Sequence, residues 1–223
     1  MSEICYVYIL LSQTPTKFGA LVRSITKTEY NHVSIAFDES LQQLYSFGRI
    51  YHNAPVIAGI VREYIERFTL LTADYVKIRI IRVPVSEQDY RNGLHIVREI
   101  QEDSEYFYNL LSVLSHPLFH GFHTPKAFSC AEFAAYMLRS MNVHLDSSAP
   151  NWAITPMEIG YALDYPIIYE GNILSADCPL RSHGTSEEMD CYFAPISFPS
   201  MLSRSIAIIL NLFLRKLHFI HHA

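Results

Sequence analysis

A cysteine stands where a helix is expected to begin. Ser129 is followed three residues later by Glu132, which is a capping-box pattern in which each side chain bonds the other residue's amide. Ser129 is therefore the predicted N-cap and Cys130 the first helical residue. Unpaired amide hydrogens and the positive end of the helix dipole favour a thiolate there, so Cys130 is a candidate nucleophile. A free cysteine is also commonly a small buried hydrophobe, and its partner residues must decide between these interpretations.

A histidine begins a predicted strand far upstream of this cysteine. In residues 31–38, apolar side chains alternate with His32, Ser34 and Ala36, which predicts a strand with one face in the core. Residues 41–47 are expected to return as its antiparallel partner. A lone strand histidine is more often a structural hydrogen-bonding residue. Thiol hydrolysis, however, needs a thiolate, an imidazole and a group that orients the imidazole, so His32 gains weight when it is paired with Cys130.

The elements that must position these two residues are predicted from hydrophobic periodicity. Strands are expected at residues 4–12, 75–83 and 165–169, and helices after Ser86, Ser129 and Thr155. The strand at 75–83 is expected to stop at Pro84. Residues 50–71 fit a helix and an extended segment equally well, and residues 175–199 show no firm periodicity.

The order of the two motifs, with the histidine strand first, matches a known arrangement. Residues 30–36 (YNHVSIA) and 129–133 (SCAEF) resemble the circularly permuted papain-like proteins related to NlpC-type cell-wall peptidases, including YiiX-like proteins. The lecithin:retinol acyltransferase group shares the permuted order. The resemblance spans residues 4–169 and implies an α+β domain, with an antiparallel sheet packed against the helix that starts at Cys130. It further implies Cys130 as nucleophile, His32 as general base and the Cys130 amide as an oxyanion donor.

This chain departs from that family at the third catalytic position. YiiX-like relatives carry an acidic residue on the strand after the histidine strand, where the nearest polar match here is Ser46. A serine hydroxyl could orient the imidazole but would stabilise imidazolium less than a carboxylate. Asn31, Tyr45 and His52 are alternatives for this role. Arg49, just past the strand, is a candidate ligand for a substrate carboxylate, with Tyr45 as a second substrate-binding candidate, although an exposed arginine at a strand end is the simpler explanation.

Composition limits the classes of partner. The 223 residues are 50% hydrophobic and 17% charged, with a net charge of −5, which is typical of a folded domain with a large core. No cluster of lysine or arginine suggests a nucleic-acid partner. The four cysteines lack the short paired spacing of zinc sites, and His116, His120 and His123 have no carboxylate or cysteine at ligand spacing. No metal or other cofactor is expected.

The C-terminal residues 201–220 form a second unusual feature. An apolar run from Ile206 to Leu214 is bounded by Arg204 and by Arg215 and Lys216. The run is too short to span a bilayer, which needs roughly 20 apolar residues. It is expected to pack on the domain or a second subunit, or to lie in a membrane interface. We expect a catalytic domain at 1–175 and an extension at 176–223. The start of the chain has no basic leader, so the expected location is cytoplasmic, either free or peripheral at a membrane.

Three functions remain open. The first is a cysteine amidase or peptidase that forms an acyl-enzyme on Cys130 with a small peptide-like or amino-acid-conjugate substrate. The second is a lipid acyltransferase or thioesterase, with the C-terminal helix presenting the site to lipid. The third is a binding module that keeps the fold without catalysis because it lacks the acid. No side-chain pattern identifies the substrate or the oligomeric state.

Overall fold

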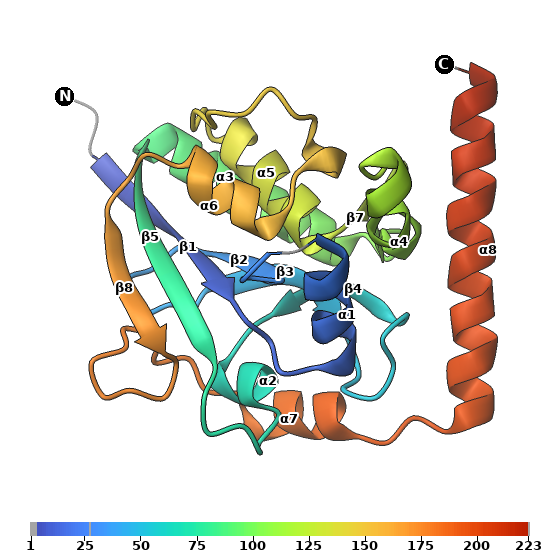
Figure 1. The fold of residues 1–223 in the computed structure, drawn as a ribbon, viewed down its shortest axis with the longest axis horizontal. Helices are drawn as coiled ribbons and strands as arrows, with labels where there is room; N and C mark the ends of the chain where they lie inside the picture. Colours follow the sequence, from blue (N-terminus) through green and yellow to red (C-terminus); the bar gives the residue numbers. More distant parts are fainter. Residues whose placement is uncertain (1–3, 27, 223) are drawn as a thin grey trace.

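The fold is built on a six-stranded antiparallel sheet (Figure 1). We describe it from a computed structural model that covers residues 4–26 and 28–222. The strand order is β4-β3-β2-β1-β5-β8, and every neighbouring pair is antiparallel. The strands are β1 (Ile4–Ser12), β2 (His32–Ala36), β3 (Leu44–Arg49), β4 (Ala58–Arg62), β5 (Lys77–Ser86) and β8 (Ile167–Asn172). The expected α+β class with an antiparallel sheet is confirmed.

Helices cover both faces of this sheet. They are α1 (Lys17–Thr26), α2 (Ile65–Thr69), α3 (Glu87–Glu102), α4 (Leu110–Phe119), α5 (Cys130–Ser140), α6 (Pro156–Ala162), α7 (Ser186–Phe193) and α8 (Phe198–His222), with a 3-10 turn at Asn151–Ala153. Helices α3, α5 and α6 lie over one face, and α2 lies beneath the other (Figure 1). A short parallel pair, β6 (Phe107–Tyr108) and β7 (Ala127–Phe128), leads into α5.

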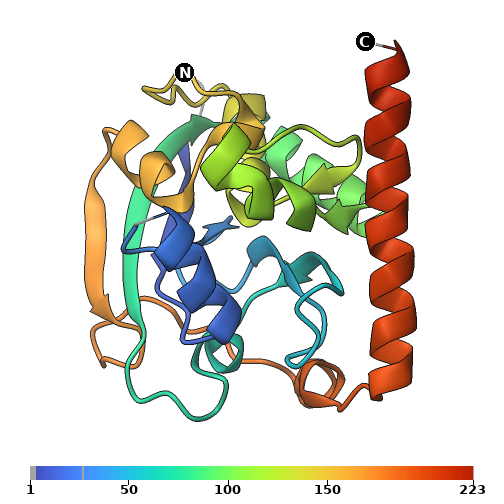
Figure 2. The ribbon, with the colours of Figure 1, turned by 45° about the vertical axis from the view of Figure 1, so that its right-hand side comes forward.

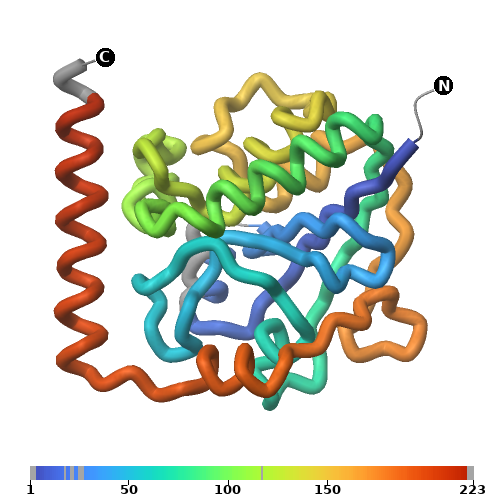
Figure 3. Tube along the Cα trace, turned by 180° about the vertical axis from the view of Figure 1, so that it is seen from behind, coloured from blue at the N-terminus to red at the C-terminus, as the bar shows by residue number. Residues whose placement is uncertain are grey.

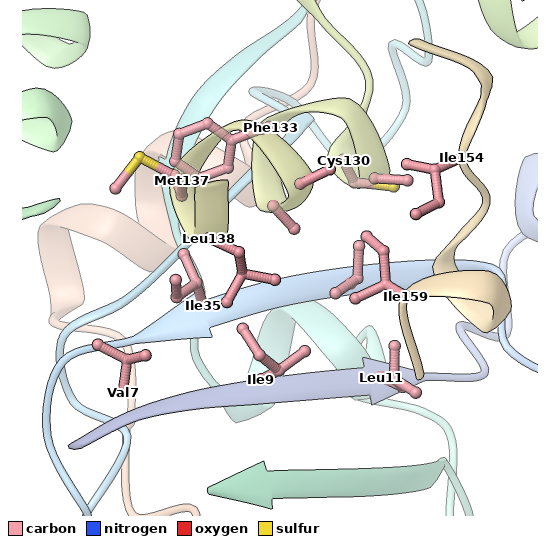
Figure 4. Close-up of a cluster of buried hydrophobic side chains, with 14 of the residues drawn as sticks. Val7, Ile9, Leu11, Ile35, Cys130, Phe133, Met137, Leu138, Ile154 and Ile159 are labelled. Atoms are coloured by element: carbon pink, nitrogen blue, oxygen red, sulfur yellow. The ribbon is translucent and has the colours of Figure 1, made fainter. Parts of the chain in front are cut away.

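Strand alternation divides the core into two layers. Val7, Ile9 and Leu11 of β1 pack beneath α5, whereas Tyr8 and Leu10 face the opposite layer. Figure 4 shows α5 lying across β2 and β1 with its apolar side chains directed at them. Both faces of β2 are buried, rather than the single core face expected from its sequence, because the second layer covers that side of the sheet as well.

The local start signals of the helices are confirmed. Ser86 accepts a hydrogen bond from the Asp89 amide, at 3.1 Å, as α3 begins. Capping boxes open α5 at Ser129 and α6 at Thr155. The segment with no clear periodicity holds a third capping box, at Thr185, which starts α7. Residues 50–71 contain both of the alternatives left open, because β4 is followed by α2.

The expected stop at Pro84 is wrong, because β5 continues to Ser86. Strand β8 pairs with β5 only as far as Ile81, so the rest of β5 is an edge strand on that side. A proline lacks the N–H of a ladder hydrogen bond and is tolerated in an edge strand. Where a strand ends therefore depends on the length of its neighbour, which the residues around Pro84 do not encode.

Packing continues beyond the domain boundary expected at residue 175. Cys178 and Leu180 are fully buried in the second core layer, and Tyr192 of α7 is also buried. Helix α8 is different. It stands beside the rest of the chain as a long rod, joined to α7 by a short connection (Figures 2 and 3). The part of the extension that is set apart is thus α8 alone.

Candidate functional site

The sulfur of Cys130 lies at the start of a well-anchored helix. Cys130 is the first residue of α5, after the Ser129–Glu132 capping box, and only 5% of its surface is exposed. Burial raises the pKa of the Cys130 thiol. Four interactions lower that pKa by more than burial raises it: the charge and hydrogen bond of His32, and hydrogen bonds from the backbone amides of Val33 and Ala131. The net shift of the Cys130 pKa is downward. The site therefore favours a thiolate despite its burial.

The His32 ring lies between the thiol and a carboxylate. Its Nε2 is 3.0 Å from Oε1 of Glu63, which leaves Nδ1 as the ring nitrogen for Cys130. Burial lowers the pKa of His32, but the charge and hydrogen bond of Cys130, followed by those of Glu63, raise it to about 10. The shifts of the two groups are opposite in direction, and both favour a proton on the imidazole rather than on the sulfur. The arrangement therefore favours a thiolate–imidazolium pair of Cys130 and His32.

Glu63 supplies the acid that the sequence did not reveal. It directly follows β4, and its amide donates to the Leu44 carbonyl oxygen at 2.7 Å, which fixes it at the edge of β3. Its Oε2 accepts from Nε of Arg67 at 3.3 Å, one helical turn along the chain. Burial raises the pKa of Glu63, but the Arg67 charge and the His32 hydrogen bond lower it to about 2. Glu63 is thus a buried, ionised carboxylate.

A glycine leaves space for this carboxylate. Gly48 of β3 faces Glu63, and a Cβ at that position would lie 3.2 Å from Oε1 of Glu63. This separation is tighter than ordinary van der Waals contact. The small residue on β3 therefore allows an acid from β4 to reach across to a histidine on β2.

The expectation that Ser46 orients the imidazole is wrong. Ser46 is buried, and its hydroxyl donates to the Val33 carbonyl oxygen at 2.9 Å, which ties β3 to β2. The partner of His32 is Glu63 instead. The acid follows β4, one strand later than the family pattern predicts, and lies in residues 50–71, which fit a helix and a strand equally well. The one sequence feature that could have indicated Glu63 is its spacing of four residues from Arg67, which is typical of an ion pair on a helix.

The two candidate substrate-binding residues, Arg49 and Tyr45, lie in different surroundings. Arg49 lines a cavity of about 620 Å³ together with His32 and Glu63, and one guanidinium nitrogen donates to the Tyr192 hydroxyl at 3.1 Å. Tyr45 packs against the Phe37 ring and lines neither this cavity nor the one beside Cys130. Arg49 thus remains a candidate for substrate contact, whereas Tyr45 is partly buried against the core and lies outside both cavities.

A second, more apolar cavity of about 430 Å³ opens onto Cys130. Its apolar lining is provided by Val113, Ala131, Trp152, Ile154 and Pro156. Asn31 and Tyr108 line both cavities, so the two hollows are neighbours, one lined by His32 and the other by Cys130. The side chain of Asn31 bonds the backbone and hydroxyl of Thr14. A substrate could place a polar group on one side of the pair and an apolar group on the other.

Two tyrosines complete the site. Tyr108 is buried and its hydroxyl is hydrogen-bonded to Cys130; burial, followed by the charge of Cys130, raises the pKa of Tyr108 well above 10, so the hydroxyl remains protonated. Tyr192 stacks on Arg67, with the guanidinium carbon 4.0 Å from the ring centroid. Both come from segments without diagnostic patterns. Tyr192 also shows that the chain beyond residue 176 forms part of the wall of the site.

The histidines at positions 116, 120 and 123 have other partners. His116 lies in α4, and its ring centroid is 5.8 Å from that of His120. Nε2 of His116 is 3.1 Å from the Ala153 carbonyl oxygen, and Nδ1 of His123 is 3.7 Å from the Glu132 carboxylate. Among residues 4–26 and 28–222, no group of three histidine, cysteine or acidic side chains is arranged to hold a metal ion. Comparisons of the chain with protein-family models, curated proteins and solved structures found no match.

Proposed function

We propose that the protein is a cysteine-dependent hydrolase of the amidase or peptidase type. One observation carries this proposal: the His32 ring lies between the Cys130 thiol and the buried Glu63 carboxylate. A nucleophile, a base and a group that orients the base are what acyl transfer through a thiol requires. Because Glu63 provides an acid beside His32, a missing acid no longer favours a non-catalytic binding module.

The chemistry follows from the proton positions. The Cys130 thiolate attacks the substrate carbonyl carbon, forming a C–S bond, and imidazolium His32 protonates the amine as the C–N bond breaks. Neutral His32 then takes a proton from water, whose oxygen attacks the thioester carbon, and the thiolate departs from the acid product. The Cys130 amide and the Tyr108 hydroxyl are the proposed donors to the tetrahedral oxyanion. Glu63 remains ionised and holds the ring.

We also propose the permuted papain-like fold for this domain. Three features support it: the histidine strand precedes the cysteine helix, that helix packs on an antiparallel sheet, and an acid bonds the far nitrogen of the histidine. The substrate class proposed is a small peptide-like or amino-acid-conjugate amide. Arg49 in the larger cavity is the proposed contact for a substrate carboxylate.

The test is the pH dependence of Cys130 alkylation by iodoacetamide, followed site by site with mass spectrometry. The thiolate is the reactive form, so we expect Cys130 to react well below pH 8.5, the ordinary pKa of a cysteine being about 8.5. Exposed Cys191 and buried Cys178 are references in the same chain. A Cys130 that is inert at every pH, or that reacts only at alkaline pH, would contradict the proposal and favour a binding module.

The apolar cavity beside Cys130 favours a second candidate, a lipid acyltransferase or thioesterase. An acyl chain would occupy the space lined by Val113, Ile154 and Trp152, with its carbonyl carbon at the sulfur. Panels of acyl thioesters and aminoacyl amides distinguish the two functions. Values of kcat/KM that rise with acyl-chain length would favour lipid chemistry, whereas turnover of amides alone would favour the amidase.

Tyr108→Phe is expected to slow Cys130 alkylation at pH 6 by about tenfold. The hydroxyl is hydrogen-bonded to the sulfur, and hydrogen bonds to charged groups contribute about 1.5 kcal/mol or more. Its loss destabilises the thiolate relative to the thiol. Tyr106→Phe is the matched control, because that ring stacks on Phe128 instead. Equal rates in the two variants would show that the Tyr108 hydroxyl does not act on the sulfur.

A further inference from the structure

Helix α8 presents a broad apolar face to solvent. The exposed fractions of its large apolar side chains on this face lie between 37% and 63%. They are Leu202, Ile206, Ile209, Leu210, Phe213, Leu214 and Leu217. At 100° per residue these positions span an arc of roughly 140°, whose centre lies about 130° around the helix from the fully buried Leu212. Such a continuous apolar surface marks an interaction site.

The rest of the chain holds this face outward. Leu212 is buried, Nη1 of Arg215 donates to the Glu105 carbonyl oxygen at 2.8 Å, and Nζ of Lys216 donates to the His123 carbonyl oxygen at 3.1 Å. These contacts lie on the inner side of α8. Helix α8 lies alongside the rest of the chain (Figure 2). These side-chain contacts fix which side of the helix faces solvent before any partner binds.

The charges of α8 identify the kind of partner. Asp190 is the last acidic residue of the sequence, so α8 carries Arg204, Arg215 and Lys216 with no carboxylate of its own. They donate to neutral oxygens of the rest of the chain, namely the carbonyl oxygens of Glu105 and His123 and the hydroxyl of Tyr51. Within the described ranges no acidic side chain forms an ion pair with them, so their positive charge is not neutralised. A second copy of α8 would add only like charge. An anionic lipid surface would supply the opposite charge together with an apolar phase.

The width of the apolar face of α8 also favours a membrane surface as the partner. A helix pair uses a narrow seam of two positions per heptad, whereas α8 exposes a face roughly 140° wide. That width suits a helix that lies in the plane of a membrane interface. No single described helix meets the length and composition of a membrane span, although α7 and α8 together do, with a bend of 88° between them.

We propose that α8 docks the protein on the surface of an anionic membrane, with its apolar face in the interface and its axis along the surface. This contact uses side chains distinct from those of the Cys130 site. It therefore holds whether or not the site is catalytic.

Vesicle co-sedimentation of the full chain tests this contact. Phosphatidylcholine vesicles with and without phosphatidylglycerol are the probes. We expect binding to the anionic vesicles, weakened by added salt because the lysine and arginine charges are screened. Ile206→Glu combined with Phe213→Glu is expected to reduce the partition coefficient tenfold or more, since two apolar side chains are lost and two negative charges are introduced.

The matched control is Gln88→Glu combined with Gln101→Glu, which adds the same charge to exposed positions of α3. Circular dichroism and thermal unfolding report whether both variants fold as the parent does. No binding to anionic vesicles, or equal binding by both variants, would overturn the proposal. A dimer in sedimentation equilibrium that the α8 variant dissociates would also overturn it, because the face would then join two copies of the chain.

Discussion

Glu63→Gln is expected to slow Cys130 alkylation at pH 6 by about tenfold to a hundredfold. Burial lowers the pKa of His32, and the charges and hydrogen bonds of Cys130 and Glu63 raise it to about 10. Glutamine keeps a hydrogen-bond acceptor for Nε2 but removes the negative charge. Each unit by which the pKa of His32 falls shifts the equilibrium tenfold from the thiolate–imidazolium pair towards the neutral thiol and imidazole.

A nearby glutamate provides the control for this variant. Glu66→Gln makes the same chemical change three residues along, where the carboxylate contacts His183 and the Gly184 amide instead of the site. The measurement is the alkylation rate of Cys130 from pH 5 to 10 for the two variants and the parent. The deficit of Glu63→Gln should shrink at alkaline pH, where the thiol ionises without help from the imidazolium. A deficit of the same size at every pH would point to altered access rather than altered charge.

The Cys130–His32 pair also explains why such a buried site can carry charge. When the proton lies on the imidazole in the folded chain and on the sulfur in the unfolded chain, which is the range between their ordinary pKa values of 6.5 and 9.0, the two states bind the same number of protons. A raised pKa, as for His32, contributes stability that is lost as pH rises. A lowered pKa, as for Cys130, contributes stability that is lost as pH falls. In the neutral range these two pH dependences cancel. The Cys130–His32 pair therefore adds little to the pH dependence of the free energy of unfolding.

Local signals predicted the parts of the site that depend on neighbours in the sequence. The Ser129–Glu132 capping box placed Cys130 at the first residue of α5, and alternation placed His32 on a strand. Both are decided within a few residues, by hydrogen bonds and side-chain direction that the sequence itself specifies. The structure brings these two residues together.

The site residues that the sequence did not reveal are positioned by contacts between segments far apart in the chain. Glu63 reaches His32 only because β4 ends beside β3 and because Gly48 leaves space between them. Tyr108 arrives through a two-residue strand, and Tyr192 through a helix without clear amphipathic periodicity. Sheet register and the packing of short elements set these positions, so no spacing along the chain reveals them.

Arg67→Gln is expected to lower the free energy of unfolding at pH 7 by about 3 kcal/mol. The guanidinium pairs with Glu63, donates to the Arg49 carbonyl oxygen and stacks on Tyr192. Without the guanidinium, the buried Glu63 carboxylate keeps only the His32 ring, which Cys130 also contacts, and removing one member of a buried ion pair is among the more costly single changes in a protein interior. Arg62→Gln is the control, since its pair with Glu188 is partly exposed and such pairs contribute less. Urea unfolding measures both.

The double variant Glu63→Gln/Arg67→Gln separates charge from packing. Without the carboxylate, the loss of the arginine should cost less, so the double variant should be more stable than the sum of the single changes predicts. The pH dependence carries the same information. Because the folded pKa of Glu63 is lowered to about 2 from 4.5, its stabilisation is present above pH 4.5 and is lost as the pH falls towards 2. In Arg67→Gln the folded pKa of Glu63 should lie closer to 4.5, so this acid loss should be smaller and should be complete at a higher pH, and in both variants that carry Glu63→Gln it should disappear. Additive losses together with an unchanged acid limb would show that Arg67 stabilises the fold by packing alone.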